Sequence, residues 1–160
     1  MDSTIKPAYE LDPLQRRQAG PDADAVKSFR LLLFTSQRLR NLLDERLRGD
    51  GLTSQQGFLL TIVGSRPRPT LGEVAKAMST THQNVKQIAS ALVRKDLLAI
   101  VPDEADARVR RLELTQASTR YWLERDAGDF AAIGSWFSAL SRDEQRELAG
   151  LLARLARSIA

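Results

Sequence analysis

The sequence contains no cysteine and only one histidine, His82. The absence of cysteine excludes disulfide bonds, thiolate metal sites, cysteine nucleophiles and thiol-based redox sensing. A single histidine argues against a His-containing catalytic triad and against a multi-histidine metal site. The sequence also has no glycine-rich phosphate-binding loop. We therefore expect a protein that is not an enzyme and that holds neither a metal ion nor a cofactor.

Long apolar runs are also missing. No stretch reaches the roughly 18 apolar residues that a membrane-spanning helix needs, and the first residues, Met1 to Thr4, do not begin a secretory signal. These absences predict a cytoplasmic protein with no membrane partner. Lysine and arginine together number 24 against 20 acidic residues, which gives a net charge of +4. This basic excess is compatible with a polyanionic partner but is too small to establish one.

Proline, glycine and apolar periodicity divide the 160 residues into a tail and one domain. Residues 1–21 contain three of the six prolines and no apolar periodicity, so we expect a flexible N-terminal tail. Its Arg16-Arg17 pair could contact a polyanion, or the tail is simply solvated. Residues 22–160 then form a single domain. Its first helix, over about 22–48, carries apolar side chains on more than one face, which is a first indication of a partner chain.

Capping signals mark the helices of the next segment. Thr53 with Gln56 and Thr70 with Glu73 have capping-box spacing and predict two short helices. Hydroxyl residues then cap a further helix over about 82–95. The last two of these helices meet at a three-residue turn, which is the spacing of a helix-turn-helix.

A short hairpin and two longer helices follow. Apolar runs at 97–101 and 109–114 flank a polar turn and predict two antiparallel strands. The next helix extends to about residue 140, although its two glycines weaken or bend it. Ser141 with Glu144 opens a last helix, which has a single leucine-rich stripe.

This order of elements is that of a winged helix-turn-helix, the only part of the pattern that implies a function. We predict a mainly α-helical fold with a small two-stranded β wing. The winged helix-turn-helix lobe covers about 53–115, and the helices at about 22–48 and 116–160 form a second, helical lobe.

The helix over about 82–95 carries candidate DNA-reading residues on its outward face. In a winged helix-turn-helix this helix enters the major groove. Glutamine and asparagine amides bond adenine, and lysine reaches guanine acceptors or a phosphate. Alternatively the face is merely solvated, and the histidine at the helix start packs, caps or acts as a proton switch. The candidates are His82, Gln83, Asn84, Lys86 and Gln87.

The wing is rich in arginine at its tip and along its second strand. A guanidinium suits the narrow, negative minor groove because it is charged yet weakly hydrated. Arg110 and Arg111 point to opposite faces of a strand, so at most one shares the side of Arg108. Asp106 either orients Arg108 or forms the turn through local backbone bonds. The wing candidates for DNA binding are therefore Asp106, Arg108 and Arg110.

Residues 71–98, the Asp106-Ala107-Arg108 motif and the closing Leu114-Thr115 pair resemble the MarR family of bacterial transcriptional regulators. The order of helices extends the resemblance over about residues 22–158. It implies an obligate homodimer in which the helical lobe is a dimerisation lobe and two winged lobes read a pseudo-palindromic site in double-stranded DNA, as a repressor. Many members release DNA when a small aromatic or phenolic effector binds between the two lobes. The sequence does not identify the residues that would bind such a ligand.

Two residues depart from the family pattern, and two alternatives stay open. Asp96 and Ser118 stand where members commonly have glycine, so a helix end at Asp96 needs either a non-glycine residue in a strained conformation or a different turn. The aromatic residues concentrated at 121–137 either pack in the core or dimer interface or line a ligand cleft. The alternative function is a winged-helix protein-interaction module without an operator, in which apolar anchors would be expected in place of Lys86 and Arg108.

Overall fold

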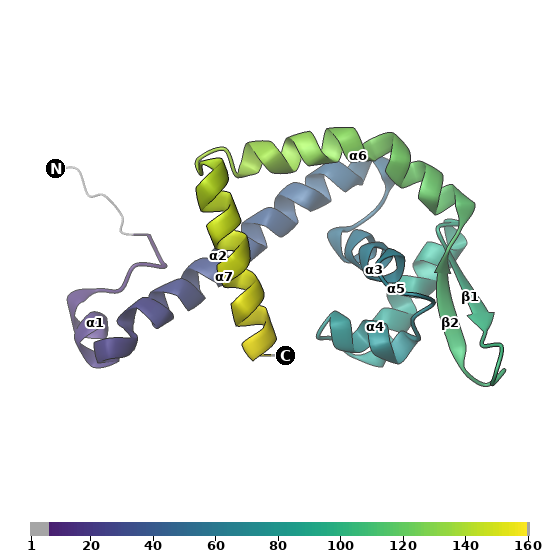
Figure 1. Cartoon of the computed structure of the whole chain (residues 1–160), viewed down its shortest axis with the longest axis horizontal. Coiled ribbons are helices and arrows are strands. Elements are labelled where there is room, and N and C mark those ends of the chain that lie inside the picture. Colours follow the sequence, from purple (N-terminus) through teal and green to yellow (C-terminus); the bar gives the residue numbers. More distant parts are fainter. Residues whose placement is uncertain (1–6, 160) are drawn as a thin grey trace.

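Two kinds of region make up the structure, a computed structural model that describes residues 7–159 (Figure 1). The helices between residues 54 and 94 and a hairpin gather in one lobe, the long helices lie largely outside it, and a short helix near the N-terminus lies at the opposite end. The elements are α1 (Pro13–Ala19), the 3-10 turn η1 (Gly20–Asp22), α2 (Ala23–Leu47), η2 (Arg48–Asp50), α3 (Ser54–Gly64), α4 (Leu71–Ala77), α5 (His82–Arg94), β1 (Leu98–Pro102), β2 (Arg110–Leu114), α6 (Gln116–Trp136) and α7 (Arg142–Ser158).

Side-chain caps determine where the helices begin. Thr53 Oγ1 accepts a hydrogen bond from the Gln56 N–H at 3.3 Å, and the Gln56 side chain accepts one from the Thr53 N–H at 3.1 Å. The same reciprocal box begins α4 at Thr70 and α7 at Ser141, whereas the Thr81 side chain alone caps α5. These bonds satisfy N–H groups that have no partner inside the helix. They confirm the helix starts predicted from the sequence.

The hairpin is attached to the helix-turn-helix along its second strand. Strands β1 and β2 pair antiparallel with Leu98 opposite Leu114, which confirms the predicted wing. The Leu112 N–H donates to the Pro69 carbonyl oxygen at 2.8 Å, just before α4 begins. The base of the wing is therefore fixed to the segment that leads into the first helix of the helix-turn-helix.

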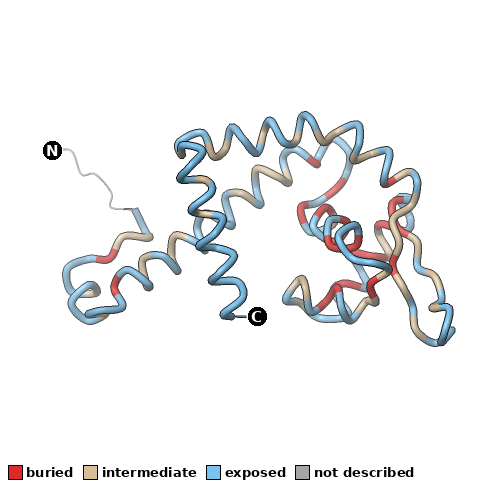
Figure 2. Tube along the Cα trace, viewed as in Figure 1, coloured by how far each residue is buried: buried red, intermediate tan, exposed pale blue. Residues whose placement is uncertain are grey.

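One apolar core holds α3, α4, α5 and the hairpin together. Figure 2 shows that the buried positions are concentrated in this lobe. Each fully buried Leu or Val contributes roughly 1.5–3 kcal/mol, so a core of this size gives α5 a rigid support. The core residues are Leu47, Leu52, Leu59, Leu60, Ile62, Val63, Val74, Ala75, Val85, Ile88, Ala89, Leu92, Leu97, Leu98 and Leu112.

The long helices, in contrast, leave large apolar side chains uncovered. None of residues 142–158, all of which the structure describes, is buried, although α7 has a leucine-rich stripe. The exposed large apolar residues of α2, α6, α7 and the C-terminal cap are Phe29, Leu32, Leu33, Phe34, Leu123, Phe130, Ile133, Leu151, Leu152, Leu155 and Ile159. Single apolar residues scattered over a surface are normal, but so many exposed apolar residues on three helices are not.

The N-terminal segment differs from the flexible tail expected over 1–21. Residues 1–6 of that range lie outside the described part of the chain, but the remainder contains α1 and η1. Asp12 and Gln15 form a capping box, and a proline at the first helical position has a backbone angle that already suits a helix. Leu11, with 3% of its surface exposed, is buried at the start of this segment. The sequence did not reveal α1 because a seven-residue helix is too short to produce visible apolar periodicity.

Helix α6 also differs in detail from the expectation. It runs without a break through Gly128 and Gly134, which were expected to weaken or bend it, and it ends at Trp136 rather than near Leu140. Within residues 7–159 there is no helix with the length and apolarity that a bilayer crossing requires.

Candidate nucleic-acid interface

Helix α5 has one buried face and one polar face. Val85, Ile88, Ala89 and Leu92 are buried in the core. The opposite face of the first two turns is exposed, and its side chains are amides, an imidazole and an ammonium. These exposed residues are His82, Gln83, Lys86 and Gln87. The core thus fixes the helix while its polar face stays free to meet a partner.

The turn before α5 has a defined geometry. Ser79 has a left-handed backbone, with φ of 49°. The Thr80 N–H donates to the Ala75 carbonyl at 3.0 Å, and the Ser79 N–H donates to the Lys76 carbonyl at 3.1 Å. This pair of bonds ends α4 in a Schellman motif. The angle between the two helices is therefore set by backbone hydrogen bonds.

Asn84 is the exception among the candidates on α5. Its Nδ2 donates to Thr80 Oγ1 at 3.0 Å, and the residue is half-buried. The structure therefore places Asn84 against the turn and not on the exposed face with the other four. Its side chain braces the start of α5, which the sequence pattern alone did not reveal.

The wing presents two of the predicted arginines to solvent. Arg108 lies in the loop and Arg110 begins β2, and both are exposed. Asp106 Oδ1 accepts a hydrogen bond from the Arg108 N–H at 2.9 Å. Asp106 therefore forms the turn, as one of its two interpretations expected, and the bond that is present goes to the backbone of Arg108.

Asp103 is a structural residue of the wing that the sequence analysis did not single out. Its carboxylate accepts hydrogen bonds from the Ala105 N–H at 2.9 Å, the Asp106 N–H at 3.2 Å and Arg111 Nε at 2.6 Å. The bond from Arg111, supported by the backbone bonds, holds the pKa of Asp103 below its usual range. Its position after Pro102 in a turn was the only available signal. Arg111 is therefore held within the wing, whereas its neighbour Arg110 is exposed. Adjacent residues of a strand point to opposite faces, which is why the two arginines differ.

An ion network joins α6 to the end of α2. Asp129 pairs with Arg46 at 2.6 Å and with Arg125 at 3.1 Å, and Arg125 also pairs with Asp50. The Tyr121 hydroxyl donates to Asp50 Oδ2 at 2.9 Å. Burial and this bond to a carboxylate raise the pKa of Tyr121, so the phenol stays protonated. The network therefore fixes α6 against the end of α2 and the turn η2.

Two adjoining cavities lie between α2, α3 and α6. One, of about 490 Å³, is mostly apolar, with Phe58, Trp122 and Phe130 among its walls and Arg46 and Asp129 at its edge. The other, of about 850 Å³, shares some of these walls and extends toward the turn before α5. Their common residues are Leu43, Phe58, Ile133 and Trp136. Among the aromatic residues at 121–137, Tyr121 and Trp122 pack on the core, and Trp122, Phe130, Trp136 and Phe137 line these cavities.

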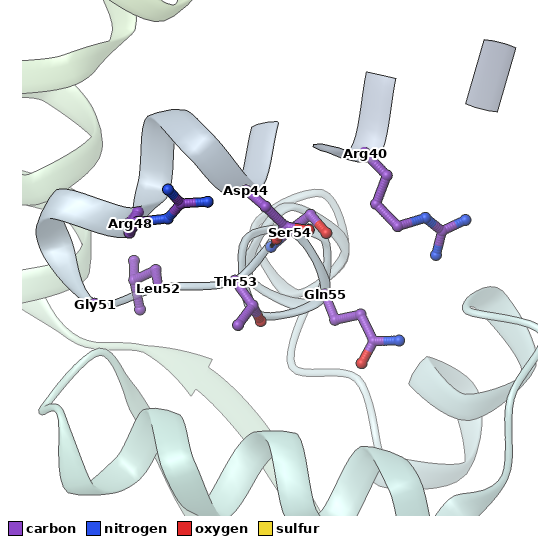
Figure 3. A pocket seen from close by; sticks show the side chains of 8 residues that line it. All are labelled: Arg40, Asp44, Arg48, Gly51, Leu52, Thr53, Ser54 and Gln55. Atoms are coloured by element: carbon purple, nitrogen blue, oxygen red, sulfur yellow. Dashed lines mark hydrogen bonds between the residues drawn. The ribbon is translucent and has the colours of Figure 1, made fainter. Parts of the chain in front are cut away.

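A further hollow of about 550 Å³ lies where α2 meets the start of α3 (Figure 3). Arg40 and Arg48 lie on opposite sides of Asp44 and do not converge on one point. Asp44 Oδ1 accepts a hydrogen bond from the Ser54 N–H at 2.6 Å. The carboxylate therefore braces the first turn of α3, and the hollow has the features of a structural junction.

Comparisons with known proteins agree with this arrangement. A model of the MarR family matches residues 50–109. The transcriptional activatory protein BadR of Rhodopseudomonas palustris is 29% identical over 101 residues, which are 57% of this chain and 56% of that protein. The HTH-type transcriptional repressor MdtR of Bacillus subtilis is 27% identical over 122 residues, which are 76% of this chain and 79% of that protein. The alignment with BadR thus spans little more than half of that relative's length.

The fold is shared with solved structures over most of the chain. The S. aureus MepR protein in its crystal structure with DNA matches with a TM-score of 0.70 and 22% identity, over 81% of this chain and 96% of that chain. The mainly helical architecture with a two-stranded wing is therefore that of these winged-helix proteins.

Proposed function

Because the chain is a member of the MarR family of winged-helix transcriptional regulators, we propose that it acts as a homodimer that binds a pseudo-palindromic operator in double-stranded DNA and represses transcription. The observation that carries this proposal is the exposed polar face at the start of α5, held on a rigid core beside an exposed arginine wing. This pairing of elements fits a major groove and an adjacent minor groove.

Each exposed candidate has a role in this proposal. Gln83 and Gln87 read base edges, and Lys86 contacts guanine acceptors or a phosphate. His82, at the first turn of α5, lies nearest the DNA backbone. Arg108 enters the minor groove and Arg110 contacts phosphate. Asn84 and Asp106 take part by fixing the turn and the wing loop.

The homodimer is supported by the apolar surface of the long helices. In one copy, Leu151, Leu152 and Leu155 of α7 keep 39–51% of their surface exposed. Phe29, Leu33 and other apolar residues of α2 are exposed as well. A second copy, related by a two-fold axis, would cover these faces and place two α5 helices on one side of the DNA.

The alternative of a protein-interaction module finds less support. Docking sites for proteins depend on a few buried aromatic or apolar anchors. The exposed face of α5 instead carries glutamines and a lysine, and the wing tip carries Arg108 and Arg110. This chemistry suits nucleic acid.

The repressor role is supported by the relative MdtR, which is named a repressor, whereas the relative BadR is named an activatory protein.

We further propose that a small aromatic or phenolic effector binds in the cavities between α2, α3 and α6. One cavity has mostly apolar and aromatic walls, which suit an aromatic ring, and the other adds polar lining residues, among them Arg40 and Asn84, which could bond the ligand's polar group. A ligand shifts DNA affinity only by its preference for one spacing of the lobes, typically about 5–150-fold. Titrating salicylate into the protein–DNA complex should lower affinity. No change in DNA affinity at millimolar salicylate and related phenolic acids would remove effector control from the proposal.

Two substitutions test the DNA contacts separately. Gln83→Ala should cost about 1–3 kcal/mol on a duplex selected from a random pool and leave binding to scrambled DNA nearly unchanged. Arg108→Ala should weaken binding to all duplexes and flatten the slope of log K against log salt by about two per dimer. Fluorescence anisotropy at several salt concentrations measures both. If the salt slope of Arg108→Ala equals that of the wild type, the wing does not contact DNA.

A further inference from the structure

An ion pair crosses the hairpin where its two strands meet the wing loop. Arg111 Nε on β2 donates to Asp103 Oδ2, just beyond the end of β1, at 2.6 Å. Both side chains are largely shielded from solvent, with 29% of Arg111 and 19% of Asp103 exposed. An ion pair in such a position is screened less than one on the open surface.

The same arginine also reaches the helix-turn-helix. Arg111 Nη1 donates to the Arg68 carbonyl oxygen at 3.2 Å and lies 3.8 Å from a Glu73 carboxylate oxygen in the first turn of α4. Arg68, whose backbone has a positive φ of 45°, pairs with Glu113 on β2 and with Glu104 in the wing loop. The loop between α3 and α4 therefore holds the wing from one side.

A continuous chain of hydrogen bonds leads from this ion pair to the wing tip. Asp103 accepts from the N–H groups of Ala105 and Asp106, and Asp106 accepts from the Arg108 N–H. The Asp103 N–H in turn donates to the Val109 carbonyl at 3.0 Å, and the Val109 N–H donates to the Asp106 carbonyl at 2.9 Å. Val109 is therefore bonded directly to Asp103, and Arg108 is connected to the Asp103 carboxylate through Asp106.

We infer that Asp103 and Arg111 are positioning residues for DNA binding, which hold the wing loop so that Arg108 is presented in a fixed geometry. Neither residue contacts DNA itself. This inference rests on the proposed DNA-binding function. A loop that is already ordered does not lose its conformational freedom when it binds, so releasing it lowers affinity without removing a contact.

Removing the charge of Asp103 should change DNA affinity in the direction opposite to the one expected from charge alone. Asp103 is an acid beside a surface that binds a polyanion, so its removal raises the positive charge of the wing. If Asp103 acted only through its charge, Asp103→Asn would tighten DNA binding. If Asp103 positions the loop, the same substitution weakens binding.

The experiment compares Asp103→Asn and Arg111→Gln with Glu104→Gln, using anisotropy on the selected duplex. Glu104 is the neighbouring acid and carries the same charge, but 87% of its side chain is exposed and Arg68 keeps Glu113 without it. We expect Asp103→Asn and Arg111→Gln to weaken binding about fivefold, and Glu104→Gln to leave it unchanged or slightly tighter. Tighter binding by Asp103→Asn would overturn the inference.

A double-mutant cycle separates positioning from direct contact. In the Arg108→Ala background, Asp103→Asn and Arg111→Gln should cause no further loss, because the contact they support is already absent. Losses that add to that of Arg108→Ala would mean that the pair affects DNA binding by a route other than Arg108 and would overturn the inference.

Amide hydrogen exchange provides a readout that is independent of DNA. Asp103→Asn should speed exchange at Ala105, Asp106 and Arg108 while the core amides of α5 keep their protection. Faster exchange with unchanged DNA affinity would contradict positioning and leave the proposed function standing. An absence of DNA binding by the wild type would instead contradict the proposed function.

Discussion

Among single residues, Asp96 at the end of α5 takes the left-handed backbone conformation that glycine usually takes at a helix terminus. Asp96 has a left-handed backbone, with φ of 56°. The Leu97 N–H donates to the Leu92 carbonyl at 3.0 Å, and the Asp96 N–H donates to the Val93 carbonyl at 3.0 Å. These are the two bonds of a Schellman motif, so the strained non-glycine residue anticipated from the sequence is present.

Replacing Asp96 tests the cost of this conformation. Asp96→Gly should raise the free energy of unfolding by about 0.5–1 kcal/mol because glycine adopts positive φ without a Cβ clash. Asp96→Ala, which keeps the clash, should lower it. Urea unfolding followed by circular dichroism measures both. A lower stability of Asp96→Gly would mean that the aspartate side chain contributes more than the backbone strain costs.

Ser118 is the second departure from the family pattern. Its energetic cost comes from a buried polar group and not from a strained backbone. The residue is fully buried at the start of α6, and its hydroxyl has no hydrogen-bond partner among the described residues. Its N–H is satisfied by Thr115 Oγ1 at 3.1 Å. The local cap of α6 therefore does not depend on the serine hydroxyl.

Among the helices and strands, those whose signals lie within a few neighbouring residues were predicted correctly from the sequence. The boundaries of α3, α4 and α5 followed from hydroxyl caps and apolar periodicity within a few residues. The short α1 was missed because its signal, the Asp12 and Gln15 box, stood alone in a proline-containing segment. The network around Asp129 could not be predicted, since Arg46 precedes it by 83 residues and only the fold brings the two together.

The Asp129 network makes a prediction about acid stability. Burial opposes ionisation of Asp129, but hydrogen bonds from Arg46 and Arg125 outweigh it and hold the pKa of this carboxyl below its usual range. A carboxyl whose pKa is lowered by folding stabilises the protein above its unfolded pKa, and this contribution is lost as the pH falls through the folded pKa. The unfolding free energy of Asp129→Asn should therefore decrease less on acidification below about pH 5 than that of the wild type.

Urea midpoints measured between neutral and acidic pH test this expectation. Asp143→Asn, which breaks an exposed pair with Arg146, is the control and should follow the wild-type curve. Equal acid sensitivity of Asp129→Asn and the wild type would mean that the network does not favour the ionised carboxylate.

At the scale of the whole molecule, the chain consists of a well-packed lobe and a set of long helices that lack a partner. In Figure 1 the first part of α2 and all of α7 lie apart from the lobe that carries α5 and the wing. Amphipathic helices gain most of their stability from packing their apolar face. The described residues of one chain do not cover the apolar face of α7, and we propose that a second copy covers it.

The dimer is tested by mass and by substitution on α7. Light scattering should give twice 17.8 kDa for the wild type. Leu151→Glu with Leu155→Glu should dissociate or unfold the protein, because charges would be buried in the interface. Ala153→Glu, on the other side of the same helix, should leave the mass unchanged. A well-folded wild-type monomer at micromolar concentration would contradict the dimer.

We propose that two winged lobes of one dimer read a symmetric DNA site. Selecting duplexes from a random pool with the full chain measures the symmetry and the spacing of that site. We expect an enriched inverted repeat whose half-site centres lie about one helical turn, or about 10 base pairs, apart, with affinity lost when about five base pairs are inserted between them. Enrichment of a single unrepeated site, or no enrichment over random DNA, would contradict it.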